Sequence, residues 1–114
     1  PYFKTFDVAA TITYNANYSY VTVKSAVETA LKEAFGIDGM DMAKSVSKSK
    51  VFKTIMKING VESCSMTYFG LDYIDQTTYP NQDYEISADF YEYIVLHENV
   101  SEKHGLILTY EQED

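Results

Sequence analysis

His97 and His104 carry the most specific chemistry in this chain, because imidazole binds metal ions and exchanges protons near neutral pH. Glu98 follows the first of them, so two imidazoles and a carboxylate could together hold a zinc ion. Their spacing matches no established zinc motif, and both histidines flank a polar segment that is expected to be an exposed loop. We therefore expect two surface histidines here and no metal site.

Cys64 is the single cysteine of the 114 residues, so no internal disulfide can form. It lies in a segment expected to be a strand, and no histidine is near it in the sequence. A nucleophilic thiol needs a neighbouring base or cation that lowers its pKa. The sequence therefore predicts that Cys64 is a small apolar packing residue.

Two pairs of carboxylates are close in sequence, Asp38 with Asp41 and Asp72 with Asp75. Each pair lies in or beside an expected loop, and no base or nucleophile accompanies it. The segment 36–39 has two glycines around an aspartate, whereas a phosphate-binding loop needs donors and a cation there. The chain thus has no complete catalytic set, and the sequence predicts no enzyme and no cofactor.

The charge pattern and the lengths of the apolar stretches argue against two classes of partner, nucleic acids and membranes. The net charge is −8, and all nine basic residues are lysines. Arginine is the residue suited to phosphate and guanine, so its absence argues against a nucleic-acid binder. No stretch approaches the roughly 18 apolar residues that span a bilayer, so no membrane is expected.

The aromatic and charged residues instead favour contacts with proteins. The chain has 11 tyrosines, whose rings pack while their hydroxyls stay wet. Lysines concentrate between residues 44 and 57, and eleven acids follow Gly70, so two complementary patches could set the register of an assembly. The candidate interface residues are Tyr91, Tyr93, Tyr110, Lys48, Lys53 and Lys57.

The elements that must position these residues follow from hydrophobic periodicity. Apolar and polar side chains alternate over residues 3–14, which predicts a strand. Residues 21–35 carry apolar side chains at helical spacing, which predicts a helix. Gly36 is expected to end that helix in the left-handed conformation.

A second helix is expected over residues 49–58. Ser47 or Ser49 would cap its start, and Gly60 would end it after Asn59. Three further strands are expected over residues 61–73, 89–98 and 106–113.

The predicted fold class is α+β, in the order β-α-α-β-β-β. A single sheet of about four strands would carry both helices on one face. The last two strands would form an antiparallel hairpin with a long loop, and the open face would be rich in tyrosine and threonine. We expect residues 1–114 to form one domain, cut from or part of a longer chain.

From Phe6 to about Tyr73 the chain resembles the C-terminal domain of baseplate J-like proteins. These are the baseplate wedge proteins of contractile phage tails and related injection machines. The resemblance consists of an alternating strand, a helix rich in valine and alanine, a linker with glycines, and a short helix that ends in Gly-Val before a strand. The matching segments are Val8–Tyr14, Val23–Leu31, Gly36 with Gly39, Ser45–Val61 and Val61–Phe69.

The resemblance implies a structural viral protein that joins neighbouring wedges into a ring and meets a second copy of itself. Its partners would be other baseplate proteins, and it would reside in the virion tail baseplate after synthesis in the bacterial cytoplasm. The alternative is a small monomeric module that binds a protein or peptide at an exposed sheet edge, with a groove lined by Tyr91, Tyr93 and Tyr110. A third hypothesis, an enzyme, would depend on Cys64 or on the two histidines.

Overall fold

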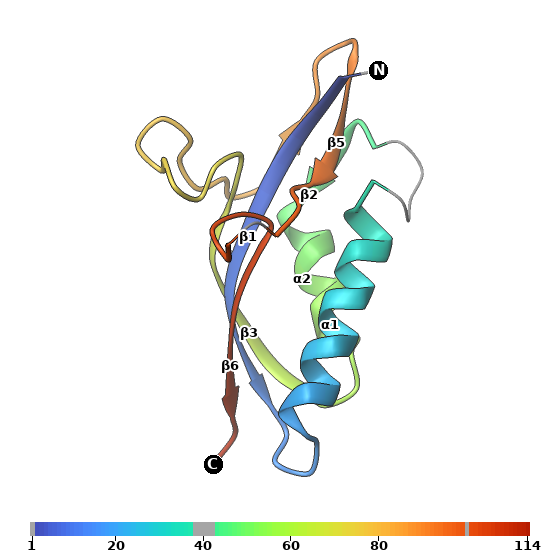
Figure 1. The fold of residues 1–114 in the computed structure, drawn as a ribbon, viewed down its shortest axis with the longest axis vertical. Helices are drawn as coiled ribbons and strands as arrows, with labels where there is room; N and C mark the ends of the chain where they lie inside the picture. Colours follow the sequence, from blue (N-terminus) through green and yellow to red (C-terminus); the bar gives the residue numbers. More distant parts are fainter. Residues whose placement is uncertain (1, 38–42, 100) are drawn as a thin grey trace.

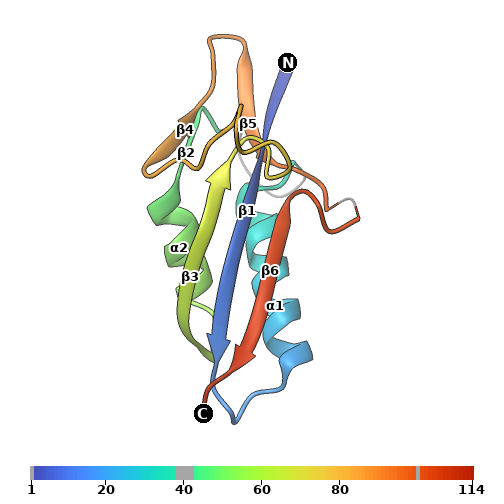
Figure 2. The same ribbon diagram turned by 90° about the vertical axis from the view of Figure 1, so that its left-hand side faces the viewer.

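The computed structural model describes residues 2–37, 43–99 and 101–114, and it confirms the α+β fold. Both helices lie on one side of the main sheet (Figure 1), behind its three long strands in the perpendicular view (Figure 2). The elements are β1 (Tyr2–Tyr14), α1 (Tyr20–Phe35), β2 (Ser45–Ser47), α2 (Lys48–Met56), β3 (Val61–Gly70), β4 (Glu85–Ser87), β5 (Glu92–Leu96) and β6 (Leu106–Gln112).

The 13-residue strand β1 is the centre of the main sheet. Its even-numbered apolar side chains, among them Phe6, Val8 and Ile12, are buried against the helices. It pairs with β3 in antiparallel orientation on one side and with β5 and β6 on the other. The alternation of residues 3–14 therefore predicted the strand and its buried face correctly.

The predicted hairpin of the last two strands is wrong. Both β5 and β6 run parallel to β1 and lie end to end along it, with Leu96 paired to Phe6 and Leu106 paired to Val8. The connection between them, residues 97–105, leaves the sheet and returns to the same edge. Because β1 is long enough to pair with both, each short strand buries its apolar residues against the core without pairing with the other.

An irregularity in β3 reverses its side-chain alternation. Ala9 pairs with Tyr68 while Ala10 pairs with Met66, so one extra residue is accommodated in β3. Met66 consequently packs on the core together with Phe69, whereas the ring of Tyr68 lies on the opposite face. In a regular strand Met66 and Tyr68 would share a face, and the bulge is the reason that they do not.

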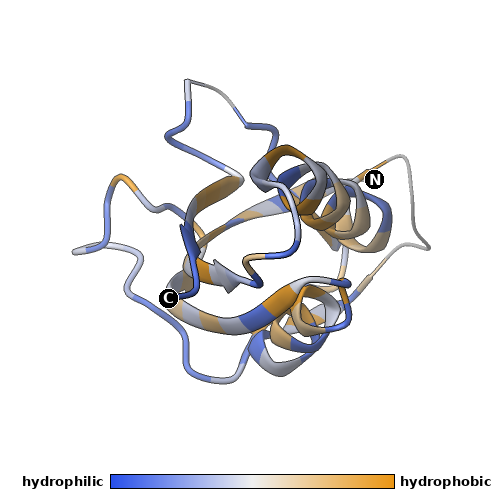
Figure 3. Ribbon diagram, turned by 90° about the horizontal axis from the view of Figure 1, so that it is seen from below, coloured by the Kyte–Doolittle hydropathy of each residue, from blue (hydrophilic) through white to orange (hydrophobic). Residues whose placement is uncertain are grey.

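The two helices bury apolar stripes against the sheet. Ser19 caps α1 by accepting the Thr22 N–H, and Ser47 caps α2 by accepting the Lys50 N–H. Viewed along the long axis, both helices alternate between hydrophobic and hydrophilic stretches (Figure 3), as expected for half-buried helices. The buried helical side chains are Val23, Val27, Leu31 and Phe35 in α1, and Val51 and Ile55 in α2.

The two helices end differently. Helix α2 ends at Met56, two residues before the predicted end, and Gly60 lies beyond it with a φ of +97°, where a Cβ would lie 2.8 Å from the Tyr18 ring. Gly36 has a φ of −79°, so the predicted left-handed conformation is wrong. The chain leaves α1 in an extended conformation, and the Gly36 N–H still donates to the Lys32 carbonyl oxygen.

Two three-residue strands, β2 and β4, were missed by the sequence analysis. They pair with each other in antiparallel orientation and form a separate small sheet in which Val46 and Ile86 are buried. Three residues are too short to show a periodic pattern. The open face of the main sheet carries threonine, serine and the Tyr68 ring, while Tyr14 and Tyr110 pack on the helix side.

Candidate functional site

The structure does not bring the three predicted interface tyrosines together. Tyr93 pairs with Phe3 at the start of β1, and Tyr110 pairs with Ile12 near its end. These two pairs are nine residue steps apart along β1, which is roughly 30 Å at about 3.3 Å per residue. Tyr91, Tyr93 and Tyr110 therefore do not line one groove.

Tyr110 is a packing residue. Its ring contacts the Tyr20 ring edge-on at 5.5 Å between centroids. Its buried hydroxyl finds no hydrogen-bond partner among the described residues, and burial raises its pKa. The Tyr110 side chain therefore stabilises the packing of β6 against α1.

An exposed aromatic cluster lies at the other end of the molecule, where β1 begins and β5 begins. Tyr2, Phe90 and Tyr91 are 70%, 96% and 62% exposed, and the Tyr2 and Tyr91 rings meet edge-on. We call these three residues the aromatic tip. Lys44 stabilises the backbone next to the aromatic tip, because its ammonium group donates to two backbone carbonyl oxygens. The same ammonium group lies 4.2 Å from the Tyr93 ring centroid.

The aromatic tip was only partly predicted. Tyr91 was a candidate from the sequence, but Tyr2 and Phe90 were not. The adjacent pair Phe90-Tyr91 was a usable signal, since two large aromatic residues in a turn before a strand have no core position to fill.

The predicted lysines lie on α2 and at its end. Lys53 and Lys57 are exposed and one helical turn apart, and Lys48 is half-buried. Lys53 and Lys57 lie on one face of α2, and Lys48 lies on another side of the helix. The structure therefore divides the predicted interface residues among three places on the molecule.

The edges of the main sheet are covered unequally. Outside β5, the Ile94 N–H donates to the Ala43 carbonyl oxygen. Outside β3, the Phe69 N–H donates to the Asn81 side chain, and the Gln82 N–H donates to the Phe69 carbonyl oxygen. Within the described residues no backbone hydrogen bond reaches the outer edge of β6, and none reaches the outer edge of β3 over residues 62–68, where register shifts interrupt its pairing with β1.

The orientation of the β6 backbone follows from the bonds at its two ends. The Val8 N–H donates to the Gly105 carbonyl oxygen at 2.7 Å. Beyond the other end, the Glu113 N–H donates to the Tyr14 carbonyl oxygen at 2.8 Å. Because the direction of backbone groups alternates along a strand, odd-numbered residues of β6 bond to β1 and even-numbered residues point outward.

A buried carboxylate lies where the partner of β1 changes from β5 to β6. Asp7 is 0% exposed, and its Oδ1 accepts the Gly105 N–H at 2.7 Å. Its Oδ2 accepts the Tyr73 N–H at 2.8 Å and lies 3.1 Å from His104 Nδ1. A buried charge needs such partners, so Asp7 fixes two connections to the central strand.

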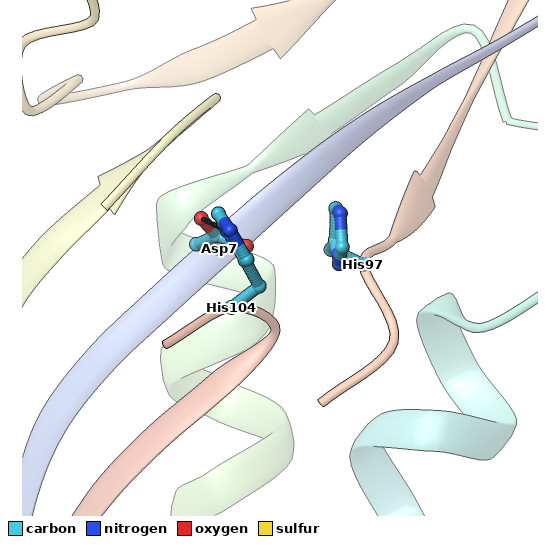
Figure 4. Close-up of side chains that lie close together, drawn as sticks. All are labelled: Asp7, His97 and His104. Atoms are coloured by element: carbon cyan, nitrogen blue, oxygen red, sulfur yellow. Dashed lines mark hydrogen bonds and ion pairs between the residues drawn. The ribbon is translucent and has the colours of Figure 1, made fainter. Parts of the chain in front are cut away.

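The two histidines meet at this carboxylate. Their rings stack with centroids 4.5 Å apart and an interplanar angle of 29°. Figure 4 shows His104 against Asp7 and His97 on the neighbouring segment. Both histidines were expected at the ends of one loop, whereas Asp7, which is remote in sequence, was not predicted. Its signal was a charge between Phe6 and Val8 in an apolar run.

The remaining candidate residues have structural roles. Burial raises the pKa of the Cys64 thiol to about 11, so the thiolate is scarce at neutral pH. Asp72 and Asp75 accept backbone N–H groups from Ile74 and Thr78. The pair at positions 38 and 41, and the glycine at 39, lie outside the described residues.

No model of a known protein family matches this chain, and no match is found among curated proteins. Among the described residues, no helix is long and apolar enough to cross a membrane.

Proposed function

We propose that this chain is a structural assembly domain that binds other protein chains by adding a strand to the outer edge of β6. The observation that carries the proposal is the absence, within the described residues, of any backbone partner on that edge. Unpaired backbone groups in a row form a template for a further strand.

The sequence of β6 supports this proposal. Natural proteins block exposed edges with lysine, proline or a bulge. The seven residues of β6 contain neither lysine nor proline, and their pairing with β1 is regular. The aromatic tip adds a second exposed surface suited to protein contacts, because aromatic residues are enriched at interfaces.

The resemblance to baseplate J-like proteins gives the proposal its setting. We propose a contractile-tail or injection-machine baseplate, in which the domain contacts a second copy of itself and other baseplate proteins. Its location would be the virion tail baseplate, reached after synthesis in the bacterial cytoplasm. The proposal includes no enzymatic activity, which agrees with the raised pKa of Cys64 and with the turn contacts of Asp72 and Asp75.

Amide hydrogen exchange tests the proposal residue by residue. In dilute monomer the N–H groups of Ile107 and Thr109 should exchange slowly, because they bond to β1, while those of Leu108 and Tyr110 exchange fast. As the chain assembles at high concentration, Leu108 and Tyr110 should become protected. Assembly, followed by light scattering, without that protection would contradict strand addition at β6.

A pair of variants provides the matched control. Thr109 on β6 and Thr11 on β1 are register partners on the open face of the sheet. Thr109→Lys places a charge on the edge strand and should weaken association by at least about tenfold, by analogy with natural edge lysines. Thr11→Lys places the same charge on the central strand and should change association far less.

The second candidate, a monomeric peptide-binding module, uses the same open edge of β6. It predicts a chain that stays monomeric at high micromolar concentration. It also predicts that Leu108 and Tyr110 gain protection when an extended peptide is added. Light scattering on the same exchange samples distinguishes the two candidates.

A further inference from the structure

We infer that His97 and His104 form a binding site for a divalent transition-metal ion of the zinc class, with Asp7 behind them as the orienting carboxylate. From the sequence, the two histidines with Glu98 could hold zinc in principle, but their spacing matches no established motif and no metal site was expected. The structure adds two observations, which are the hydrogen bonds of the imidazoles and the position of Asp7.

Each imidazole has its Nδ1 engaged by an oxygen. His97 Nδ1 lies 2.7 Å from the Glu98 carbonyl oxygen, and His104 Nδ1 lies 3.1 Å from Asp7 Oδ2. A carbonyl or carboxylate oxygen accepts, so each Nδ1 carries the proton in the neutral ring. The lone pair of each ring is then on Nε2, which is the arrangement of metal-binding histidines that an outer carboxylate or carbonyl orients.

The distances allow one ion to reach both rings. One potential ligand atom from each of Asp7, His97 and His104 lies within 4.8 Å of the others. Tetrahedral zinc with bonds of about 2.0–2.1 Å needs ligand atoms about 3.3 Å apart. The rings are stacked at an interplanar angle of 29°, so their in-plane lone pairs do not converge, and the imidazoles would have to reorient to hold one ion.

The charge around the rings favours a cation. Asp7 is fully buried, and Asp72 Oδ1 lies 3.8 Å from His104 Nδ1. His104 is 28% exposed, so an ion can reach its ring from solvent, and His97 borders a cleft of about 300 Å³ that His104 and Asp7 do not line. Two imidazoles select zinc, copper, nickel or cobalt over magnesium and calcium, which prefer oxygen ligands.

The bound ion would join the two ends of the connection between β5 and β6. His97 follows β5 directly, and His104 precedes β6 by two residues. A metal held by both would fix the connection to Asp7 on the central strand. This role is structural, and it does not depend on the proposed assembly at β6.

Zinc titration of the tag-free chain tests the inference, since the chain has only these two histidines. We expect one zinc per chain, a rise of several degrees in the unfolding midpoint that a chelator reverses, and NMR shifts of both Nε2 nuclei. Magnesium at the same concentration should produce none of these effects. Unchanged Nε2 resonances would overturn the site, as would one zinc per two chains with a doubled mass.

The His97→Phe variant separates metal binding from ring stacking. Phenylalanine keeps an aromatic ring against His104 and leaves the bond between Asp7 and His104 in place, but it offers no ligand. We expect at least a tenfold loss of zinc affinity and little change in the metal-free unfolding midpoint. Zinc affinity equal to that of the original chain would refute the inference.

Discussion

At the scale of single residues, Asp7 connects parts of the chain that are far apart in sequence. Its carboxylate accepts N–H groups from Tyr73 and Gly105 and contacts His104, while none of its own surface reaches water. These bonds offset the cost of burying a charge, and they hold two connections against β1.

Replacing Asp7 should therefore lower the free energy of unfolding strongly. Asp7→Ala leaves the Tyr73 and Gly105 N–H groups buried without an acceptor, and we expect a loss of about 3–5 kcal/mol in the free energy of unfolding. Urea denaturation measures it. Asp75→Ala removes an exposed carboxylate that also accepts a backbone N–H, and its much smaller effect is the control. Equal losses for both variants would contradict the role assigned to Asp7.

At the scale of elements, the connection between β5 and β6 depends on left-handed backbone conformations. Gly105 has a φ of +76°, and a Cβ there would collide with the His97 carbonyl oxygen. Ser101 and Glu102 have φ values of 53° and 58°. Residues other than glycine adopt this left-handed backbone conformation only at a cost in free energy.

Two substitutions in this connection should affect the free energy of unfolding differently. Gly105→Ala should lower the free energy of unfolding by at least about 1–2 kcal/mol, the cost of the left-handed conformation alone, with the collision added. Glu102→Gly should leave it unchanged or raise it by up to about 1 kcal/mol, because glycine adopts that φ freely. Thermal or urea unfolding of both variants checks the pair, and a stabilising Gly105→Ala would contradict the structure.

Hydrophobic periodicity and capping residues predicted those elements whose signals lie entirely within one segment of the sequence. The alternation of β1, the stripe of α1 and the Ser47 cap of α2 are all visible within one segment. The partner of a strand is a property of the whole chain, so the sequence could not show that β5 and β6 both pair with β1. The same reason hid the site, because Asp7 is about ninety residues from the histidines and only the sheet brings them together.

At the scale of the whole molecule, the fold keeps two weak acids protonated. Burial raises the pKa of Cys64 from 9.0 to about 11, and burial also raises the pKa of Tyr110. In the unfolded chain both groups lose their protons at lower pH than in the folded protein. Above about pH 9 the unfolded state therefore binds fewer protons than the folded state.

Global stability should consequently fall as the pH rises from 9 to 11. Below about pH 8 both groups are almost fully protonated in both states and contribute almost no pH dependence. Urea unfolding across this range measures the effect, and Cys64→Ala should reduce the slope by removing the thiol. A free energy of unfolding that stays constant from pH 8 to 11 would show that neither group is buried as described.

The parallel pairing of β1 with β6 also determines how the domain would carry mechanical load. The start of β1 and the end of β6 lie at opposite ends of a molecule 46 Å long (Figure 1). Tension applied at Tyr2 and Gln112 would try to slide one strand along the other, so the backbone bonds that join Val8–Tyr14 to Leu106–Gln112 would resist together and not one after another. Strands loaded in shear in this way must break many bonds at once, which suits a domain that transmits force.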